Sequence, residues 1–173
     1  MIGHSSGAMM AAIVMATALR QSPRIPEGLS IGLLTLGHCS PLLSRQPEAL
    51  AYRASLLGLC RDPRLHWADV TAPPDGCCFA LMDPTEGLEI GADARRPQLI
   101  NPRFAQAFAP DRYQAIRKDK FRCHFQYLMA GERPAAWDLF SVVAGRQRFA
   151  TRIAPLGSVR GFGQFKLRMF GKS

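Results

Sequence analysis

Residues 3–7 read GHSSG, a Gly-x-Ser-x-Gly pattern, and the mostly apolar stretch AMMAAIVMATALR follows directly at residues 8–20. In a nucleophile elbow with this pattern, the serine sits on a tight, strained turn between a strand and a helix. We predict that both flanking glycines are needed, because side chains there would collide with neighbouring backbone. A helix from Ser6 or Gly7 to Gln21 would then direct its free N–H groups and positive dipole end at Ser5. The alternative is a simple Gly/Ser turn in front of a buried helix.

The segments that follow alternate between strand-like and helical patterns. Leu29–Leu36 is almost entirely apolar, as expected for a parallel strand that is covered on both faces. Pro47–Cys60 has the apolar spacing of a helix, and Leu65–Thr71 is a second strand candidate. This order predicts an α/β fold with a mostly parallel sheet flanked by helices.

The second half of the chain has weaker patterns. Cys77–Met82 is predicted to be a short strand or a loop. Asp83–Arg103 is rich in glycine, proline and charge, which predicts a loop excursion and hints at a lid over a site. Phe104–Arg117 is predicted to be a weak helical or an irregular segment, and Asp138–Ala144 is predicted to be a final strand.

Composition restricts the class of protein. With 173 residues, 47% hydrophobic and 20% charged, the chain suits a globular domain. Its longest apolar run, Ala8–Leu19, is shorter than the ~18 residues of a membrane span, and no Lys or Arg precedes it as in a signal peptide. The five cysteines, two of them adjacent, do not form a secreted disulfide framework. We therefore expect a cytoplasmic protein with reduced thiols.

A nucleophilic serine needs a base, and the base needs a carboxylate that orients it. Of the four histidines, His124 is the expected base, because it comes late in the chain in a loop-to-helix segment. His4 is expected to have a structural or substrate-lining role, and His38 could line the pocket. His66 lies at the start of a predicted strand, which is the wrong end for an active site in an open α/β sheet. Asp75 is the expected acid, since it follows a predicted strand in a Pro-Pro-Asp-Gly turn. Asp69 and Asp83 are the second and third choices.

The GHSSG elbow with its alanine-rich helix resembles the α/β-hydrolase superfamily, in particular its serine esterases and lipases. The strand Leu29–Leu36 running into Gly37 and Pro41, and the order Ser5, Asp75, His124, are similar to that family as well. The resemblance covers roughly residues 1–144, and only the elbow in it is a specific motif.

The resemblance implies acyl transfer. Ser5 would attack an ester, thioester or amide carbonyl, His124 would move the proton, and Asp75 would orient His124. The backbone N–H of Ser6 would supply one donor of the oxyanion hole. No metal or organic cofactor is required, and the partner would be a small-molecule or lipid ester. Because the family places several strands before the elbow, we also expect this chain to be the C-terminal portion of a longer protein.

Three alternatives stay open. The first is a non-catalytic binding module or inactive fragment with the same fold. The second is a metal site, suggested by the pairs His38-Cys39, Cys77-Cys78 and Cys123-His124, although no Cys-x-x-Cys or His-x-x-x-His spacing supports it.

The third alternative concerns residues 145–173, which supply seven of the nine net positive charges and contain no acidic residue. We predict a poorly ordered basic tail there, distinct from the domain at residues 1–144. Its arginines and lysines interleave with four phenylalanines, which would permit contact with nucleic acid or an anionic membrane. These phenylalanines are Phe149, Phe162, Phe165 and Phe170.

Overall fold

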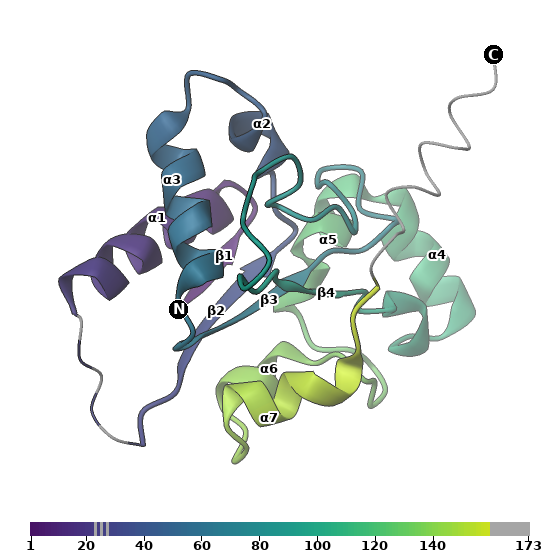
Figure 1. Cartoon of the computed structure of the whole chain (residues 1–173). Helices are drawn as coiled ribbons and strands as arrows, with labels where there is room; N and C mark the ends of the chain where they lie inside the picture. Colours follow the sequence, from purple (N-terminus) through teal and green to yellow (C-terminus); the bar gives the residue numbers. More distant parts are fainter. Residues whose placement is uncertain (23, 25, 27, 160–173) are drawn as a thin grey trace.

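Four short parallel strands form one sheet in the computed structural model, which describes residues 1–22, 24, 26 and 28–159 (Figure 1). The strands lie in chain order: β1 (Ile2–His4), β2 (Ile31–Leu36), β3 (Leu65–Val70) and β4 (Gln98–Ile100). All three neighbouring pairs are parallel. Their carboxyl ends therefore share one edge of the sheet, which is where ligand sites of open α/β sheets form.

Seven α-helices within the described residues surround this sheet, and the predicted α/β fold with helices flanking a parallel sheet is confirmed at that level. Helices α1 (Ser6–Gln21) and α3 (Leu50–Arg61) pack together on one face. Figure 1 shows α6 (Leu139–Val143) and α7 (Phe149–Ile153) on the other face. The remaining elements are α2 (Pro41–Ser44), η1 (Phe104–Gln106), α4 (Pro110–Lys118), α5 (Lys120–Phe125), η2 (Gln126–Leu128) and η3 (Ala154–Leu156).

Alternating side chains of β2 supply both halves of the hydrophobic core. Leu33 packs with residues of α1 and α3, while Leu34 and Leu36 pack with Tyr127 and with residues of α6 and α7. All three leucines are almost completely buried. The continuous apolar pattern of this strand thus reflects burial on both faces, as the sequence indicated.

Two predictions about the C-terminal part are wrong for the described residues. The segment predicted as a strand at Asp138–Ala144 is helix α6, because Asp138 caps it by accepting hydrogen bonds from the N–H groups of Phe140 and Ser141. Residues 145–159 are not poorly ordered either: they include α7, and the N–H of Val159 donates to Leu99 O at 2.9 Å.

Phe149 of α7 packs directly against β2. A methyl group built on Gly32 would approach the Phe149 ring to 2.4 Å, so the absence of a side chain at Gly32 makes room for this ring. Phe149 is therefore part of the domain and not free for stacking on a partner. The other three tail phenylalanines, Phe162, Phe165 and Phe170, lie outside the described residues.

The segment at residues 83–103 is mainly turns and loop but also contributes strand β4. Its Leu88 and Ile90 are buried in the core beside α1 and α3, so this part of the segment is packed against the domain instead of covering a site. The residues at 77–82 form turns and no strand. No helix among the described residues has the length and apolar character that a membrane crossing requires.

Candidate functional site

Ser5 lies on a strained turn at the carboxyl end of β1, directly before α1. Its backbone angles are φ 57° and ψ −127°, a region that residues with a Cβ rarely occupy. The N–H of Ser5 donates to Leu36 O of the neighbouring strand at 2.9 Å, which holds the turn against the sheet. The Ser5 hydroxyl makes no capping bond to α1, and so it remains available for other chemistry.

The two glycines of the GHSSG stretch differ in how much space surrounds their Cα atoms. A Cβ on Gly3 would lie 2.5 Å from Gly7 O and 2.7 Å from Ala8 Cα, which no rearrangement of a flexible side chain can relieve. A Cβ on Gly7 would meet no atom within 4 Å. The predicted collision therefore holds for Gly3 and is wrong for Gly7.

The first turn of α1 faces the Ser5 turn. Small side chains of this helix, including Ala8, Ala11 and Ala12, are buried against the sheet. The N–H of Ser6 has no hydrogen-bond partner among the described residues. An unsatisfied N–H at the N-terminus of a 16-residue helix offers both a donor and positive dipole potential to an anion beside Ser5.

Asp75 and His124 are joined, although 49 positions separate them in the sequence. His124 Nδ1 lies 2.8 Å from Asp75 Oδ2, and the Asp75 side chain has no solvent exposure. Two more donors reach the same carboxylate: the Tyr127 hydroxyl at 2.9 Å from Oδ2, and the backbone N–H of Cys77 at 2.9 Å from Oδ1. Three hydrogen bonds thus satisfy this buried carboxylate and hold His124 in one orientation.

The His124 ring is also tied to the strand that carries the elbow. His4 Nε2 donates to His124 O at 2.8 Å, and the two imidazole centroids are 4.6 Å apart. Burial is the main cause that lowers the pKa of His4, which favours its neutral form. A Cβ on Gly37, where φ is 53°, would lie 3.3 Å from His124 Cε1, so the turn after β2 also approaches this ring closely.

Ser5 and His124 are not hydrogen bonded to each other in the part of the chain that the structure describes. The polar contact of Ser5 Oγ is Cys39 Sγ at 4.0 Å. His124 Nδ1 is occupied by Asp75, while its Nε2 makes no hydrogen bond with any described residue. The structure therefore brings Asp75 and His124 together and links His124 to the residue before Ser5, and it leaves the proton-accepting nitrogen free.

The other candidate acids have different partners. Asp69 is fully buried within β3, where Thr35 donates to its Oδ1 and His38 Nε2 lies 3.3 Å from its Oδ2. Burial raises the pKa of Asp69 to about 6. Asp83 forms an ion pair with Arg96 at 2.9 Å. Neither carboxylate is bonded to His124.

Of the remaining histidines, His66 lies where the sequence predicted it, whereas the pocket-lining role predicted for His38 is wrong. His66 is exposed near the amino end of β3, away from the edge that carries Asp75. His38 follows β2 but is completely buried, so it belongs to the interior and does not line an open pocket.

Sequence reasoning missed Tyr127, whose hydroxyl also accepts a hydrogen bond from Ala72 N–H at 2.8 Å. Burial raises the pKa of this phenol far above its usual range, so it acts only as a neutral donor and acceptor. The sequence named Cys39 and Cys77 only in adjacent pairs that could bind a metal, and not as neighbours of Ser5 or Asp75. Tyr127 lies in η2, three positions after His124, whereas Cys39 and Cys77 lie in the segments that follow β2 and β3.

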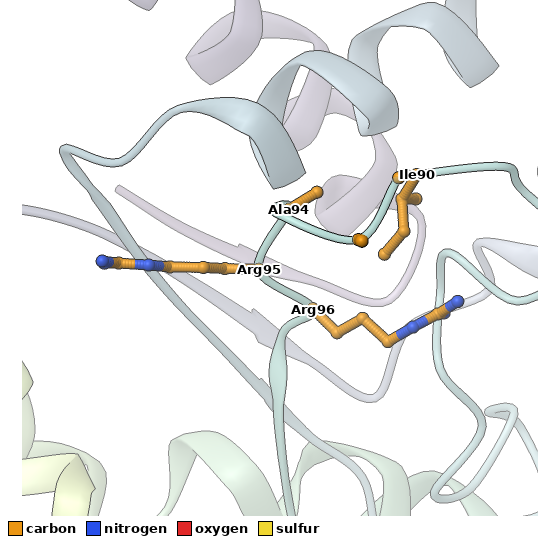
Figure 2. Close-up of a pocket in the computed structure, with 6 residues that line it drawn as sticks. Ile90, Ala94, Arg95 and Arg96 are labelled. Carbon is orange, nitrogen blue, oxygen red and sulfur yellow. The ribbon is translucent and has the colours of Figure 1, made fainter.

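The hollow drawn in Figure 2 is separate from this site. It encloses about 580 Å³ and is lined by residues 90–92 and 94–96, with Arg95 and Arg96 pointing in opposite directions. A second hollow of about 560 Å³ is lined by Trp137, Phe140 and Arg152 among others. Neither is lined by Ser5, Asp75 or His124.

Comparisons with protein-family models, with curated proteins and with solved structures found no match. Function must therefore be inferred from the chemistry of the site.

Proposed function

We propose that this chain is a serine hydrolase of esterase or lipase type, with Ser5 as nucleophile, His124 as general base and Asp75 as the orienting acid. The observation that carries the proposal is the combination of a strained serine at a strand-to-helix turn with a buried Asp–His pair at the same edge of the sheet. Strain of this kind clusters at functional sites, where the surrounding structure enforces it. Gly3 has no room for a side chain, as the first glycine of an elbow requires.

The hydrogen bonds assign the tautomer of the base. Asp75 as a carboxylate can only accept, so Nδ1 of His124 carries the hydrogen and Nε2 carries the lone pair. Nε2 would take the proton of Ser5 Oγ as the hydroxyl attacks an acyl carbonyl, and would return it to the leaving group. Water would then repeat the sequence on the acyl-enzyme. Asp75 would stabilise the imidazolium that forms in each step.

Charge on the tetrahedral intermediate would be stabilised by the N–H of Ser6 and the N-terminus of α1. This N–H has no partner in the described residues, and α1 is long enough for a sizeable dipole. A second oxyanion donor is not identified in the described residues. Losing one such donor costs ~10²–10³ in rate, so a site with Ser6 alone would be slow.

The topology supports the α/β-hydrolase family as the proposed relationship. Ser5 follows β1, Asp75 follows β3 and His124 follows β4, in a sheet whose strands lie in chain order. This sequence of nucleophile, acid and base, each after a parallel strand, is the order of that family. The order and the elbow together are more specific than either one alone.

The competing function is a non-catalytic binding module, and one observation favours it. Ser5 Oγ faces Cys39 at 4.0 Å and makes no hydrogen bond to His124 within the described chain. Catalytic hydrogen bonds are often long before substrate binds, so this geometry does not decide between the two functions.

The test is the intact mass of the purified chain after treatment with a fluorophosphonate. We expect one adduct on the parent and on Ser30→Ala, which changes an exposed serine, and none on Ser5→Ala. Labelling of Ser5→Ala equal to the parent would place the reactive group elsewhere. A parent chain that stays unlabelled would favour the binding module.

A further inference from the structure

The Asp75–His124 pair is part of a set of three side chains that could bind a metal ion. Asp75, Cys77 and His124 each present one ligand atom, and these atoms all lie within 4.8 Å of one another. A carboxylate oxygen, a thiolate sulfur and an imidazole nitrogen are the three ligand types that Zn²⁺ accepts in proteins. Mg²⁺ and Ca²⁺ prefer oxygen ligands alone, so the set selects a thiophilic ion.

The backbone places Cys77 beside the pair. Asp75 N–H donates to Ala72 O at 3.0 Å, which closes a turn, and Cys77 N–H donates to Asp75 Oδ1 at 2.9 Å. Cys77 is exposed, so its sulfur can be reached from solvent. The Tyr127 hydroxyl holds Asp75 Oδ2 from the other side, as an outer-shell group holds a metal-binding carboxylate.

Two other cysteines lie close by but have different surroundings. The thiol of Cys78 points to Asp75 O at 3.5 Å and to the Tyr127 hydroxyl at 3.6 Å. Cys123 is buried, whereas Cys77 is exposed. Of these three cysteines, Cys77 is the one whose sulfur lies in the group of ligand atoms with Asp75 and His124.

We propose that Asp75, Cys77 and His124 bind one Zn²⁺ ion, which inserts between Asp75 and His124 and switches the pair off. Ligand atoms of tetrahedral zinc, with bonds of ~2.0–2.3 Å, lie roughly 3.3–3.6 Å apart. Asp75 Oδ2 and His124 Nδ1 are 2.8 Å apart without the ion, so a small opening of the pair admits it. Water completes the fourth position.

The protons balance in this exchange. The Cys77 thiol releases its proton to solvent and binds Zn²⁺ as a thiolate. The hydrogen of His124 moves from Nδ1 to Nε2 by tautomerisation, which frees the Nδ1 lone pair for the metal. With a hydrogen on Nε2, His124 cannot accept the proton of Ser5. This consequence rests on the proposed hydrolase function, whereas the metal site itself does not.

The binding test uses Co²⁺, added as its chloride to the full-length chain. We expect a thiolate-to-Co²⁺ charge-transfer band that saturates at one ion per chain and disappears on addition of Zn²⁺. Cys77→Ser should lose this band and bind Zn²⁺ at least ~10–100-fold more weakly, since it removes a direct ligand. Cys78→Ser is the matched control and should keep the band. A band that survives in Cys77→Ser, or that is absent in the parent, would overturn the proposal.

A second measurement separates this proposal from the proposed function. Ser5→Ala should bind Co²⁺ like the parent, because Ser5 is not a ligand. Fluorophosphonate labelling of the parent should stop with one equivalent of Zn²⁺ and return with a chelator. Zinc binding without labelling under any condition would reject the hydrolase and keep the metal site. Labelling that one equivalent of Zn²⁺ leaves unchanged would reject the switch.

Discussion

Two carboxylate–histidine pairs lie near the carboxyl end of β3, one with its aspartate inside the strand and one with its aspartate after it. They differ in what surrounds them. In the pair of Asp75 and His124, every acceptor of the buried carboxylate is satisfied and the histidine keeps some exposure, 9% of its side chain. In the pair of Asp69 and His38, both side chains have no exposure at all. Asp69 Oδ2 makes no hydrogen bond to any described residue.

The two histidines also differ in their free nitrogens. His38 uses both: Nδ1 accepts from Ser40 N–H at 3.1 Å, and Nε2 donates to Met82 O at 3.1 Å. His124 uses Nδ1 for Asp75 and leaves Nε2 without a partner in the described part of the chain. A buried Asp–His contact is therefore not enough to mark a site, and the two pairs differ in that His124 keeps one ring nitrogen without a hydrogen-bond partner among the described residues.

The largest effect should come from removing that nitrogen. His124→Gln should slow fluorophosphonate labelling of Ser5 by ~10²–10⁴-fold, because general base catalysis typically contributes this much. His66→Gln is the control, since His66 is exposed near the other end of β3 and should leave the rate unchanged. Labelling rates from intact mass over time provide the measurement. Equal rates in the parent and His124→Gln would remove His124 from the mechanism.

The second pair should affect stability with a definite pH dependence. Asp69 has a pKa of about 6 in the folded chain against an ordinary 3.8, so the folded state binds more protons between these values. Stability should thus fall as pH rises from about 4 to about 6, by roughly 3 kcal/mol, and level off above pH 6. In Asp69→Asn this fall should disappear. Urea unfolding of both chains at pH 4, 5, 6 and 7 measures it, and parallel pH profiles would contradict the account.

Tyr127→Phe should have a smaller effect on the first pair. It removes one of three hydrogen bonds to Asp75 and leaves Ala72 N–H buried without its acceptor. We expect a loss of about 1–3 kcal/mol in unfolding free energy. Labelling of Ser5 should fall by less than with His124→Gln, because Asp75 keeps two donors. A rate loss as large as that of His124→Gln would mean that Tyr127 itself takes part in the chemistry.

The smallest effect should come from the link between β1 and His124. His4→Ala removes the hydrogen bond from Nε2 to His124 O and the contact between the rings. A loss of about 1 kcal/mol is expected, with a modest decrease in the labelling rate. Thermal unfolding with labelling on the same samples checks both. A loss of stability much larger than this would show that His4 supports the fold through more than its contacts with His124.

Local patterns were enough for much of the fold. Strand β2 and helix α1 could be predicted because burial imposes a continuous apolar run on one and small, spaced residues on the other. Strand β4 could not, since it has three residues inside a segment rich in glycine, proline and charge. Helix α6 was mistaken for a strand because its Val-Val run outweighed Asp138, whose side-chain cap decides the conformation.

For the site, the sequence could predict candidate residues but not which of them are in contact. Asp69, Asp75 and Asp83 all follow or end apolar runs, and only the folded chain shows that Asp75 is the one bonded to His124. Cys77 came to the site through a turn fixed by Asp75 itself. Two adjacent cysteines do not match a known metal-ligand spacing, so the sequence could not predict the zinc site proposed above.

The most direct test of the central claim compares Asp75→Asn with Asp69→Asn in one experiment. The account predicts that Asp75→Asn lowers the rate of fluorophosphonate labelling at Ser5 by more than ~10²-fold at neutral pH, because the wrong tautomer of His124 is then favoured. Asp69→Asn should stay close to the parent. Equal losses in both variants, or a larger loss in Asp69→Asn, would contradict the assignment of Asp75 and His124 as the working pair.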